Sequence, residues 1–396
     1  MIYDCIIIGG GAAGLMCAAT MPQPVRGLLL EKTPRAGTKL LMSGSGQCNI
    51  THAGSIKDFT PAYGPAGKKV RSCLYKYSNL ELMDFMEAGG VPLVTREDGK
   101  VFPQSMDSHD VLYNFMRCAK KNGFEIEYNC SVEHIKQLDD GKWTVTAGSQ
   151  DYTCRNLVIA SGGCSYPTSG SDGSLFNVLS DDLGIIITEL KPSLAPVKVA
   201  EYPYTELSGI SFESPSVSFW DGDKKLIQYE DAVLFTHKDF SGPGILNISK
   251  YASVGCQMKI NYVHPLNYED VLSRLKIATA NSKADMNNIL ASEFDLPKRF
   301  CQNLVSRYGE GLKNLAKALT GETFVVNSVA GFNKAMATAG GIELSQVKLQ
   351  TMEFKSLPGL FAIGECLDVD GMTGGYNLQF CYSSARACGV RITELL

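Results

Sequence analysis

The feature that most constrains this chain is a glycine pattern close to its N-terminus. An apolar run, Cys5 to Ile8, is followed directly by "GGGAAG", in which Gly9, Gly11 and Gly14 fit the spacing G-x-G-x-x-G. In this pattern the first glycine permits a tight turn after a strand, the second lets the backbone approach a pyrophosphate, and the third lets the next helix pack closely on the strand. The sequence therefore predicts a dinucleotide-binding β-α-β unit, with Ala12 and Ala13 in the first helical turn.

An acidic residue ends the second predicted strand, the position at which a dinucleotide-binding unit has one. The second predicted strand, "GLLLE", ends at Glu31, about twenty residues after the glycines, where a carboxylate accepts hydrogen bonds from an adenosine ribose. Lys32 follows directly and is expected in the same site. Glycines alone are a weak signal, but a strand, a glycine turn, a helix and a second strand ending in Glu form a specific one.

A second glycine-rich loop, "SGSGQCNIT", follows about a dozen residues later and holds Gly44, Gly46 and Gln47. It neither follows a strand nor opens a periodic helix, so we do not expect a second phosphate cradle. Glycines would let its backbone lie flat along an extended cofactor, and Asn49 would supply a donor and an acceptor to it. Lys39 is expected near the pyrophosphate. Cys48 is a redox thiol or a small buried hydrophobe, and the second is favoured because no partner cysteine is near in sequence.

The C-terminal stretch is the most informative about chemistry. The apolar strand "LFAIGE" ends at Gly364 and Glu365, and in two-dinucleotide-binding flavoproteins such a strand brings an acidic residue to the ribityl chain of FAD. The segment "GMTGGYNLQ" then opens the last helix, predicted from Gly374 to about Leu395. The positive end of this helix would favour the negative charge of a reduced flavin ring. Three further residues at the helix start are also expected to contact the cofactor: Gly375, Tyr376 and Asn377.

The residue pattern of the predicted strands changes twice along the chain, which indicates an insertion. We expect an α/β, Rossmann-like FAD domain formed by residues 1–190 and 331–396. Residues 191–330 are expected to form an inserted substrate-side domain, whose proline-punctuated alternating segments predict a β unit over 191–265 and whose periodic segments predict helices over 266–330. No second glycine fingerprint follows a strand between residues 150 and 340, so no separate NAD(P)-binding domain is expected.

Composition excludes several classes of protein. The 396 residues carry 37 basic and 41 acidic side chains without a dense basic run, which argues against a nucleic-acid partner. No apolar run reaches about 18 residues, so no membrane span is expected. No basic leader precedes the first strand, and the 13 cysteines include no CxxC pair, a pattern of reduced thiols in the cytoplasm. Asp368 and Asp370 are read as helix caps, and no metal site is expected.

Five segments together resemble the BaiN-like and aminoacetone-oxidase-like flavoprotein family: "KLLMSGSGQCNIT", "GKVFPQS", "ASGGCSYPTSGSDG", "LFTHKDFSGPGILNIS" and "GLFAIGECLDVDGMTGGYNLQ". The resemblance spans the chain. It implies non-covalent FAD, a glutathione-reductase-type FAD domain and an inserted β-barrel with a small helical part. It adds Val132, through its backbone, as a contact to adenine, with Ser161 and Gly162 in the same site. The family usually has Arg where Gln47 stands and Lys where Cys164 stands, which bears on substrate preference.

Catalytic candidates are few. His237, in "LFTHKDFSGP", has the chemistry of a proton donor but equally that of a hydrogen-bonded turn residue. Tyr166 is a second candidate donor, with core packing as its alternative. The histidines other than His237 have no partner pattern. The resemblance favours an FAD-dependent reductase of a conjugated, steroid-like or bile-acid-like carbonyl compound, with NAD(P)H as a transient donor. The alternatives are an oxidase of a small amine, an RNA-modifying flavoprotein and a non-catalytic flavin sensor.

Overall fold

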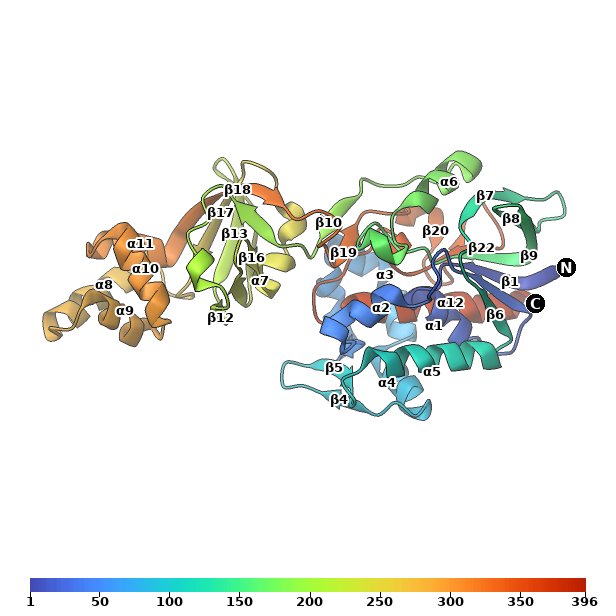
Figure 1. Cartoon of the computed structure of the whole chain (residues 1–396), viewed down its shortest axis with the longest axis horizontal. Coiled ribbons are helices and arrows are strands. Elements are labelled where there is room, and N and C mark those ends of the chain that lie inside the picture. Colours follow the sequence, from blue (N-terminus) through green and yellow to red (C-terminus); the bar gives the residue numbers. More distant parts are fainter. The chain divides into compact units, whose positions relative to one another are not determined.

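The computed structural model describes every residue from Met1 to Leu396 and divides the chain into two compact units (Figure 1). Unit 1 joins Met1–Lys191 to Met336–Leu396, and unit 2 is Pro192–Ala335. The sequence places these boundaries at residues 190 and 330. Unit 1 is therefore built from both ends of the chain, and unit 2 is an insertion in it.

A parallel sheet forms the centre of unit 1. Its five parallel strands follow the order β22-β9-β1-β2-β6, and the last four residues of β1 are buried. Strands covered on both faces are continuously apolar rather than alternating, which explains the runs "CIII" and "GLLL". The bounds are β1 (Ile2–Ile8), β2 (Gly27–Leu30), β6 (Phe124–Glu127), β9 (Gln150–Ile159) and β22 (Leu360–Ala362).

Helices and smaller strands surround this sheet. Helix α1 packs against α5 and α12, and the sheet is extended by the β7–β8 hairpin and by β20–β21. A separate small sheet has the order β3-β5-β4. The helices are α1 (Ala12–Ala19), α2 (Thr38–Met42), α3 (Gly64–Lys76), α4 (Asn79–Ala88), α5 (Ser108–Lys121), α6 (Ser174–Leu183) and α12 (Tyr376–Leu395). The strands are β3 (Thr51–His52), β4 (Leu93–Thr95), β5 (Lys100–Pro103), β7 (Val132–Gln137), β8 (Trp143–Ala147), β19 (Ala337–Ala339), β20 (Val347–Lys348) and β21 (Glu353–Phe354).

Unit 2 combines an antiparallel sheet with a helical part. The sheet order is β12-β15-β16-β11-β18-β17-β13-β14, and no pairing joins β12 to β14. The strands expected to form a barrel form this antiparallel sheet. It also uses β18 (Glu322–Val329), within the stretch expected to be helical, because the chain returns to the sheet after its helices. The other elements are β10 (Lys191–Ser193), β11 (Val197–Val199), β12 (Ser211–Phe212), β13 (Ser216–Asp221), β14 (Lys224–Glu230), β15 (Val233–Phe235), β16 (Phe240–Ser241), β17 (Gln257–Asn261), α7 (Pro243–Leu246), α8 (Tyr268–Asn281), α9 (Met286–Phe294), α10 (Lys298–Tyr308) and α11 (Leu312–Gly321).

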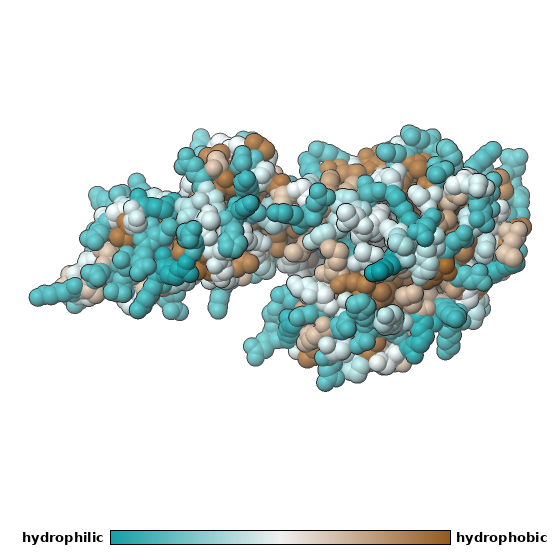
Figure 2. Space-filling view, viewed as in Figure 1, coloured by the Kyte–Doolittle hydropathy of each residue, from teal (hydrophilic) through white to brown (hydrophobic).

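The apolar core of unit 2 is rich in aromatic residues that come from both the sheet and the helices. Phe235 of β15 stacks on Tyr204, and Phe300 of α10 contacts Phe212 of β12. On the face shown in Figure 2, the helical part of this unit is covered mainly by hydrophilic residues. None of the helices in the structure combines the length and the hydrophobicity that crossing a bilayer requires.

Candidate cofactor site

The carboxyl ends of four parallel strands gather the predicted cofactor residues at one edge of the sheet in unit 1. Gly9 follows β1, Glu31 follows β2, Ser161 follows β9 and Gly364 follows β22. Strand β1 lies between β2 on one side and β9 on the other, so the chain reverses its direction of travel across the sheet at β1. In open α/β sheets ligands bind at this switch point, outside the carboxyl ends of the strands.

The three fingerprint glycines have different tasks. Gly9 has φ +109°, and a Cβ there would lie 2.4 Å from the carbonyl oxygen of Ala160. A Cβ on Gly14 would lie 2.0 Å from the oxygen of Gly9, so close packing of helix and strand requires that glycine. A Cβ on Gly11 would meet nothing within 4 Å, so its missing side chain faces open space. No side chain caps the N-terminus of α1 next to it. This open, uncapped turn fits a pyrophosphate.

Glu31 is held rigidly beside this turn. Glu31 is only 7% exposed to solvent. Oε2 accepts a 2.7 Å hydrogen bond from the Gly10 amide, and Oε1 accepts bonds from the amide and hydroxyl of Thr33 at 2.8 and 2.7 Å. Lys32 is different, because its ammonium pairs with Asp172 at 2.5 Å and bonds Ser174 at 2.9 Å. Its contact with the cofactor stays a prediction, and its ammonium is held in an ion pair near the surface.

A second cluster of polar side chains forms around Glu365, three residues after the end of β22. Lys39 Nζ, from α2, lies 2.6 Å from Glu365 Oε2 and 2.5 Å from Ser165 Oγ. Glu365 Oε1 accepts bonds from Ser165 Oγ at 2.9 Å and from the Thr338 amide at 2.9 Å. We call Lys39, Ser165, Thr338 and Glu365 the Glu365 cluster. The side chains of Lys39 and Glu365 are 24% and 17% exposed, so their charges are available to a ligand.

Two side-chain amides that are expected to face the cofactor also bond the protein's own loops. When the Asn49 amide is oriented so that both of its groups find partners, Nδ2 donates to the oxygen of Thr51 at 2.8 Å and Oδ1 accepts from the Gly375 amide at 3.1 Å. Asn377 Oδ1 and Nδ2 both bond the backbone of Gly371 at 2.8 Å. Glycine loops leave backbone groups without helix or strand partners, and these amides satisfy them. The contacts of Asn49 and Asn377 with the flavin stay predictions, and both side chains also hold the glycine loops in place.

The glycine-rich loop after α2 has an arginine partner that sequence analysis missed. Gly44 and Gly46 have positive φ values of +55° and +88°. Gln47 Oε1 accepts a 2.7 Å hydrogen bond from Arg96, whose guanidinium carbon lies 3.9 Å from the ring centroid of Phe102. This places a cation beside Gln47, although Arg96 lies 49 positions away in sequence.

Cys48 in the same loop is a buried thiol. It is 0% exposed, and burial raises its pKa to about 12 against the opposing hydrogen bond from Ser43. Burial, followed by the charges of Glu365 and Asp172, also raises the pKa of Cys164. Neither thiol is activated as a nucleophile or redox group.

The remaining predicted residues have varied surroundings. Val132 begins β7, and Gly162, with φ +72°, lies close to Ser171. Tyr166 is half-buried with φ +54°, in the turn after β9. His237 lies in unit 2, in an exposed turn, so it stays a prediction as a proton donor.

His52 and Tyr376 form a contact that sequence analysis also missed. Their ring centroids are 5.5 Å apart with an interplanar angle of 11°. The other histidines with no expected partner also have one: His109 bonds Asp107, and His134 and His264 pair with Asp182 and Glu230.

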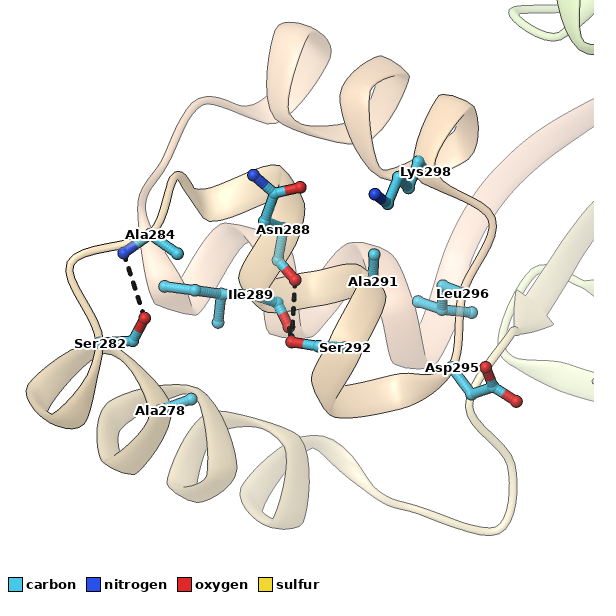
Figure 3. Close-up of a pocket in the computed structure, with 10 residues that line it drawn as sticks. All are labelled: Ala278, Ser282, Ala284, Asn288, Ile289, Ala291, Ser292, Asp295, Leu296 and Lys298. Carbon is cyan, nitrogen blue, oxygen red and sulfur yellow. Dashed lines mark hydrogen bonds between the residues drawn. The ribbon is translucent and has the colours of Figure 1, made fainter.

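A hollow in the helical part of unit 2 has a different character. It lies among the end of α8, α9 and the start of α10, and its hydrogen bonds join Ser282 to Ala284 and Ser292 to Asn288 (Figure 3). Its charged lining residues are Asp295 and Lys298. Small side chains and local backbone bonds dominate it, so it lacks the convergent polar groups of a cofactor site.

A family model described as the HI0933-like protein Rossmann domain matches residues 3–391 of the chain. The chain belongs to this family. It is an FAD-dependent oxidoreductase, and the open turn at Gly11, Glu31 and the Glu365 cluster are the residues suited to hold FAD.

Curated relatives match nearly the whole chain. Proteins named ribosomal RNA dihydrouridine synthase, from Haemophilus influenzae and Escherichia coli, are 28% and 29% identical, covering 98% of this chain and 98% and 97% of their own lengths. The 3-dehydro-bile acid delta(4,6)-reductase of Clostridium scindens is 25% identical, covering 98% of both chains.

Solved structures share the fold. A flavocytochrome c3 fumarate reductase superposes with a TM-score of 0.54 and 15% identity, covering 99% of this chain and 78% of that one. The 3-ketosteroid-delta4-(5alpha)-dehydrogenase of Rhodococcus jostii RHA1 superposes with a TM-score of 0.52 and 15% identity, covering 98% and 96%. At this identity the likeness concerns the fold alone.

Proposed function

We propose that this protein uses FAD to reduce a carbon–carbon double bond conjugated to a carbonyl group, in a small steroid-like or bile-acid-like ketone. One observation carries the proposal: relatives aligned over 97–98% of their lengths are named for this kind of bond reduction, and this chain keeps the FAD cradle. The Clostridium scindens relative, by its name, acts on a bile acid with a 3-keto group. The carbonyl withdraws electrons from the double bond and makes its far carbon accept a hydride.

Each group of the cradle has a task in this chemistry. FAD supplies the hydride, while the protein supplies orientation and electrostatics. The Gly11 turn and the start of α1 would hold the pyrophosphate, and Glu31 the adenosine ribose. Lys39 and Glu365 would hold the chain between phosphate and ring, and the positive end of α12 would stabilise charge on the ring. Tyr166 and His237 are the proposed proton donors.

A second candidate substrate is a uracil in ribosomal RNA. The two relatives named for dihydrouridine synthesis are 28% and 29% identical, against 25% for the bile-acid reductase. The C5–C6 double bond of uracil is conjugated to the C4 carbonyl, so both substrates demand the same hydride chemistry. The net charge of −4 and the absence of a dense basic run favour the small molecule.

Anaerobic reoxidation distinguishes these substrates. Photoreduced holoenzyme is mixed with a steroid 4,6-dien-3-one, with unmodified ribosomal RNA, or with buffer, and flavin absorbance is followed while products are examined by mass spectrometry. Rapid reoxidation by the dienone, with two hydrogens added to it, supports the proposal. Reoxidation by RNA alone selects the second candidate. Reduction of oxidised enzyme by a small aminoketone, followed by fast reoxidation in air, selects the amine oxidase. If none of these compounds changes the flavin absorbance, the result selects the non-catalytic flavin sensor.

For the electron donor, we propose that NAD(P)H docks transiently and leaves before the substrate binds. Unit 2 pairs its strands antiparallel, which differs from the parallel β-α-β arrangement of a dedicated nicotinamide domain. Sequential use of one site predicts ping-pong kinetics, in which substrate and nicotinamide compete. A ternary complex with both ligands bound would contradict it.

A further inference from the structure

His52 lies in unit 1 against the first residue of α12, in a position shaped for its ring. The imidazole stacks on Tyr376, and the edge of Phe59 contacts both rings, with centroids 6.2 Å from His52 and 5.1 Å from Tyr376. A Cβ on Gly374 would lie 3.7 Å from His52 Cδ2. His52 therefore supports the helix start that the sequence predicts to lie at the flavin ring.

Both ring nitrogens of His52 face backbone carbonyl oxygens. Nδ1 lies 2.7 Å from the oxygen of Ala53, and Nε2 lies 3.0 Å from the oxygen of Asp98. A carbonyl oxygen only accepts hydrogen bonds, and a neutral imidazole has a single N–H donor. The two contacts are therefore both hydrogen bonds only when both nitrogens carry a proton, and the ring is then a cation.

The β4–β5 turn fits closely over the same ring edge. Gly99, with φ +80°, lies against Cε1, the ring atom between the two nitrogens of His52. A Cβ on Gly99 would lie 2.2 Å from this atom. The Ala53 amide also donates to the oxygen of Gly99 at 2.7 Å. The two carbonyl contacts are thus fixed by the backbone on either side of the ring.

The charged groups of the β4–β5 turn, which lies against His52, are paired. From the β4–β5 turn, the Asp98 carboxylate pairs with Lys100 at 2.6 Å, a hydrogen bond that lowers the pKa of Asp98. Arg96 of the same turn points to Gln47.

The other elements around His52 carry charged residues that are exposed or paired: Lys57 and Asp58, close to Phe59 in sequence, are exposed, and Glu81 of α4 pairs with Arg386 at 2.9 Å. Tyr63, behind Tyr376, has a pKa raised by burial and stays neutral. From α4, the amide of Asn79 donates to the His52 backbone oxygen at 2.9 Å. The charge of a doubly protonated His52 therefore acts on the stacked Tyr376 ring and on the start of α12.

We propose that His52, protonated on both nitrogens, is a positioning residue of the flavin site that makes the binding of reduced FAD depend on pH. At low pH its charge adds to the positive end of α12 and favours the negative charge of the reduced flavin. As pH rises and the ring loses a proton, one carbonyl contact and this charge are lost together. The inference rests on FAD binding by unit 1 and does not depend on which substrate is reduced.

The test measures the midpoint potential of the bound flavin in the holoenzyme from about pH 5 to 8, the range in which histidine titrates. His52→Phe keeps an aromatic ring on Tyr376 but removes both nitrogens. His109→Phe removes an exposed histidine as the matched control. In wild type we expect the affinity for reduced FAD, relative to that for oxidised FAD, to be roughly tenfold higher at the acidic end than at the basic end. This corresponds to a shift of about 30 mV in the midpoint potential of a two-electron couple. His52→Phe should lose this extra dependence, and His109→Phe should keep it.

A second measurement keeps the inference testable if His52→Phe binds no FAD. Nitrogen-15 NMR of the wild-type holoenzyme should show both His52 ring nitrogens protonated at the acidic end and only one at the basic end, with Tyr376 ring signals moving in parallel. An identical potential curve in wild type and His52→Phe would overturn the proposal. So would a His52 ring with one unprotonated nitrogen throughout the range. Neither readout uses a substrate, so failure here is distinct from failure of the proposed reductase activity.

Discussion

The two units each contain a cluster of charged and polar side chains, and the clusters differ in what surrounds them. In unit 2, the Glu322 side chain is 0% exposed and pairs with Arg307 at 2.8 Å. Its oxygens also accept bonds from Tyr262 at 2.6 Å, from Tyr308 at 3.0 Å and from Tyr204. In unit 1, the Glu365 cluster is partly exposed and belongs to the same sheet edge as the open turn at Gly11.

This difference separates a cluster that holds the fold from one that faces a ligand. In the Glu322 cluster, burial raises the pKa of Tyr262 well above its ordinary value and that of Tyr308 to about 12, so these tyrosines remain neutral donors to one carboxylate. The cluster joins α10 to β18, and its carboxylate is fully occupied by bonds from the protein itself. The Glu365 cluster retains exposed charge, which a ligand can use.

The largest effect should come from Arg307→Met in unit 2. It leaves the Glu322 carboxylate buried without its ion pair, which costs about 3–5 kcal/mol of unfolding free energy in such sites. Urea unfolding measures the loss, and FAD titration should show unchanged affinity in the folded protein. Arg274→Met is the control, because Arg274 is half exposed at 3.9 Å from Glu293 and should cost under about 1 kcal/mol. A loss equal to that of the control would contradict a fold-holding role for the Glu322 cluster.

The next effect concerns Glu31 in unit 1. Replacing its carboxylate in Glu31→Gln removes a charge-assisted hydrogen bond worth roughly 1.5–3 kcal/mol, so the dissociation constant of FAD should rise about tenfold or more. Fluorescence titration of the apoprotein measures it. Glu125→Gln, an exposed residue of the neighbouring strand β6, should leave the constant unchanged. Equal affinities in the two variants would remove Glu31 from the cofactor site.

The sequence predicted the parts of unit 1 that are local in the chain. The strand, turn and helix at Gly9 to Gly14 and the strand ending at Glu31 are continuous segments whose periodicity and glycines determine their form. The Arg96–Gln47 contact and the contact of His52 with the Asp98 oxygen could not be predicted, because tertiary packing brings distant segments together.

The sheet of unit 2 shows the same limit. Alternating segments indicate strands, but closure into a barrel depends on whether β12 and β14 meet, and alternation does not encode that pairing. The polar amides at Asn49 and Asn377 were assigned to the flavin because their chemistry suits it. The backbone of the glycine loops competes for the same groups, and this need is not visible in the sequence.

A smaller effect is expected at alkaline pH in unit 2. Tyr308 has a folded pKa of about 12 against about 10 for an ordinary tyrosine. Its contribution to stability is complete below about pH 10 and is lost as pH rises toward 12. Tyr308→Phe should therefore lose less stability than wild type over this range, and Tyr251→Phe, an exposed tyrosine, should behave as wild type. Thermal unfolding at several pH values measures it, and parallel curves for Tyr308→Phe and wild type would contradict it.

The smallest effect concerns Cys48. Because its pKa is raised to about 12 and its side chain is buried, iodoacetamide near neutral pH should leave it unmodified in the native protein. Cys118 on α5 is the most exposed of the 13 cysteines and should react first. Peptide mass spectrometry assigns the modified residues. Rapid labelling of Cys48 would show that the glycine-rich loop opens in solution.

The central claim, that the open turn at Gly11 holds FAD, is tested most directly by comparing Gly11→Ala with Gly14→Ala. The added Cβ meets nothing within 4 Å at Gly11 but lies 2.0 Å from a backbone oxygen at Gly14. Wild type should bind one FAD per chain. Gly11→Ala should unfold at the same urea concentration as wild type and bind FAD at least about tenfold more weakly, because the methyl group fills space needed by the pyrophosphate. Gly14→Ala should lose stability itself. Wild-type FAD affinity in a stably folded Gly11→Ala protein would contradict the claim.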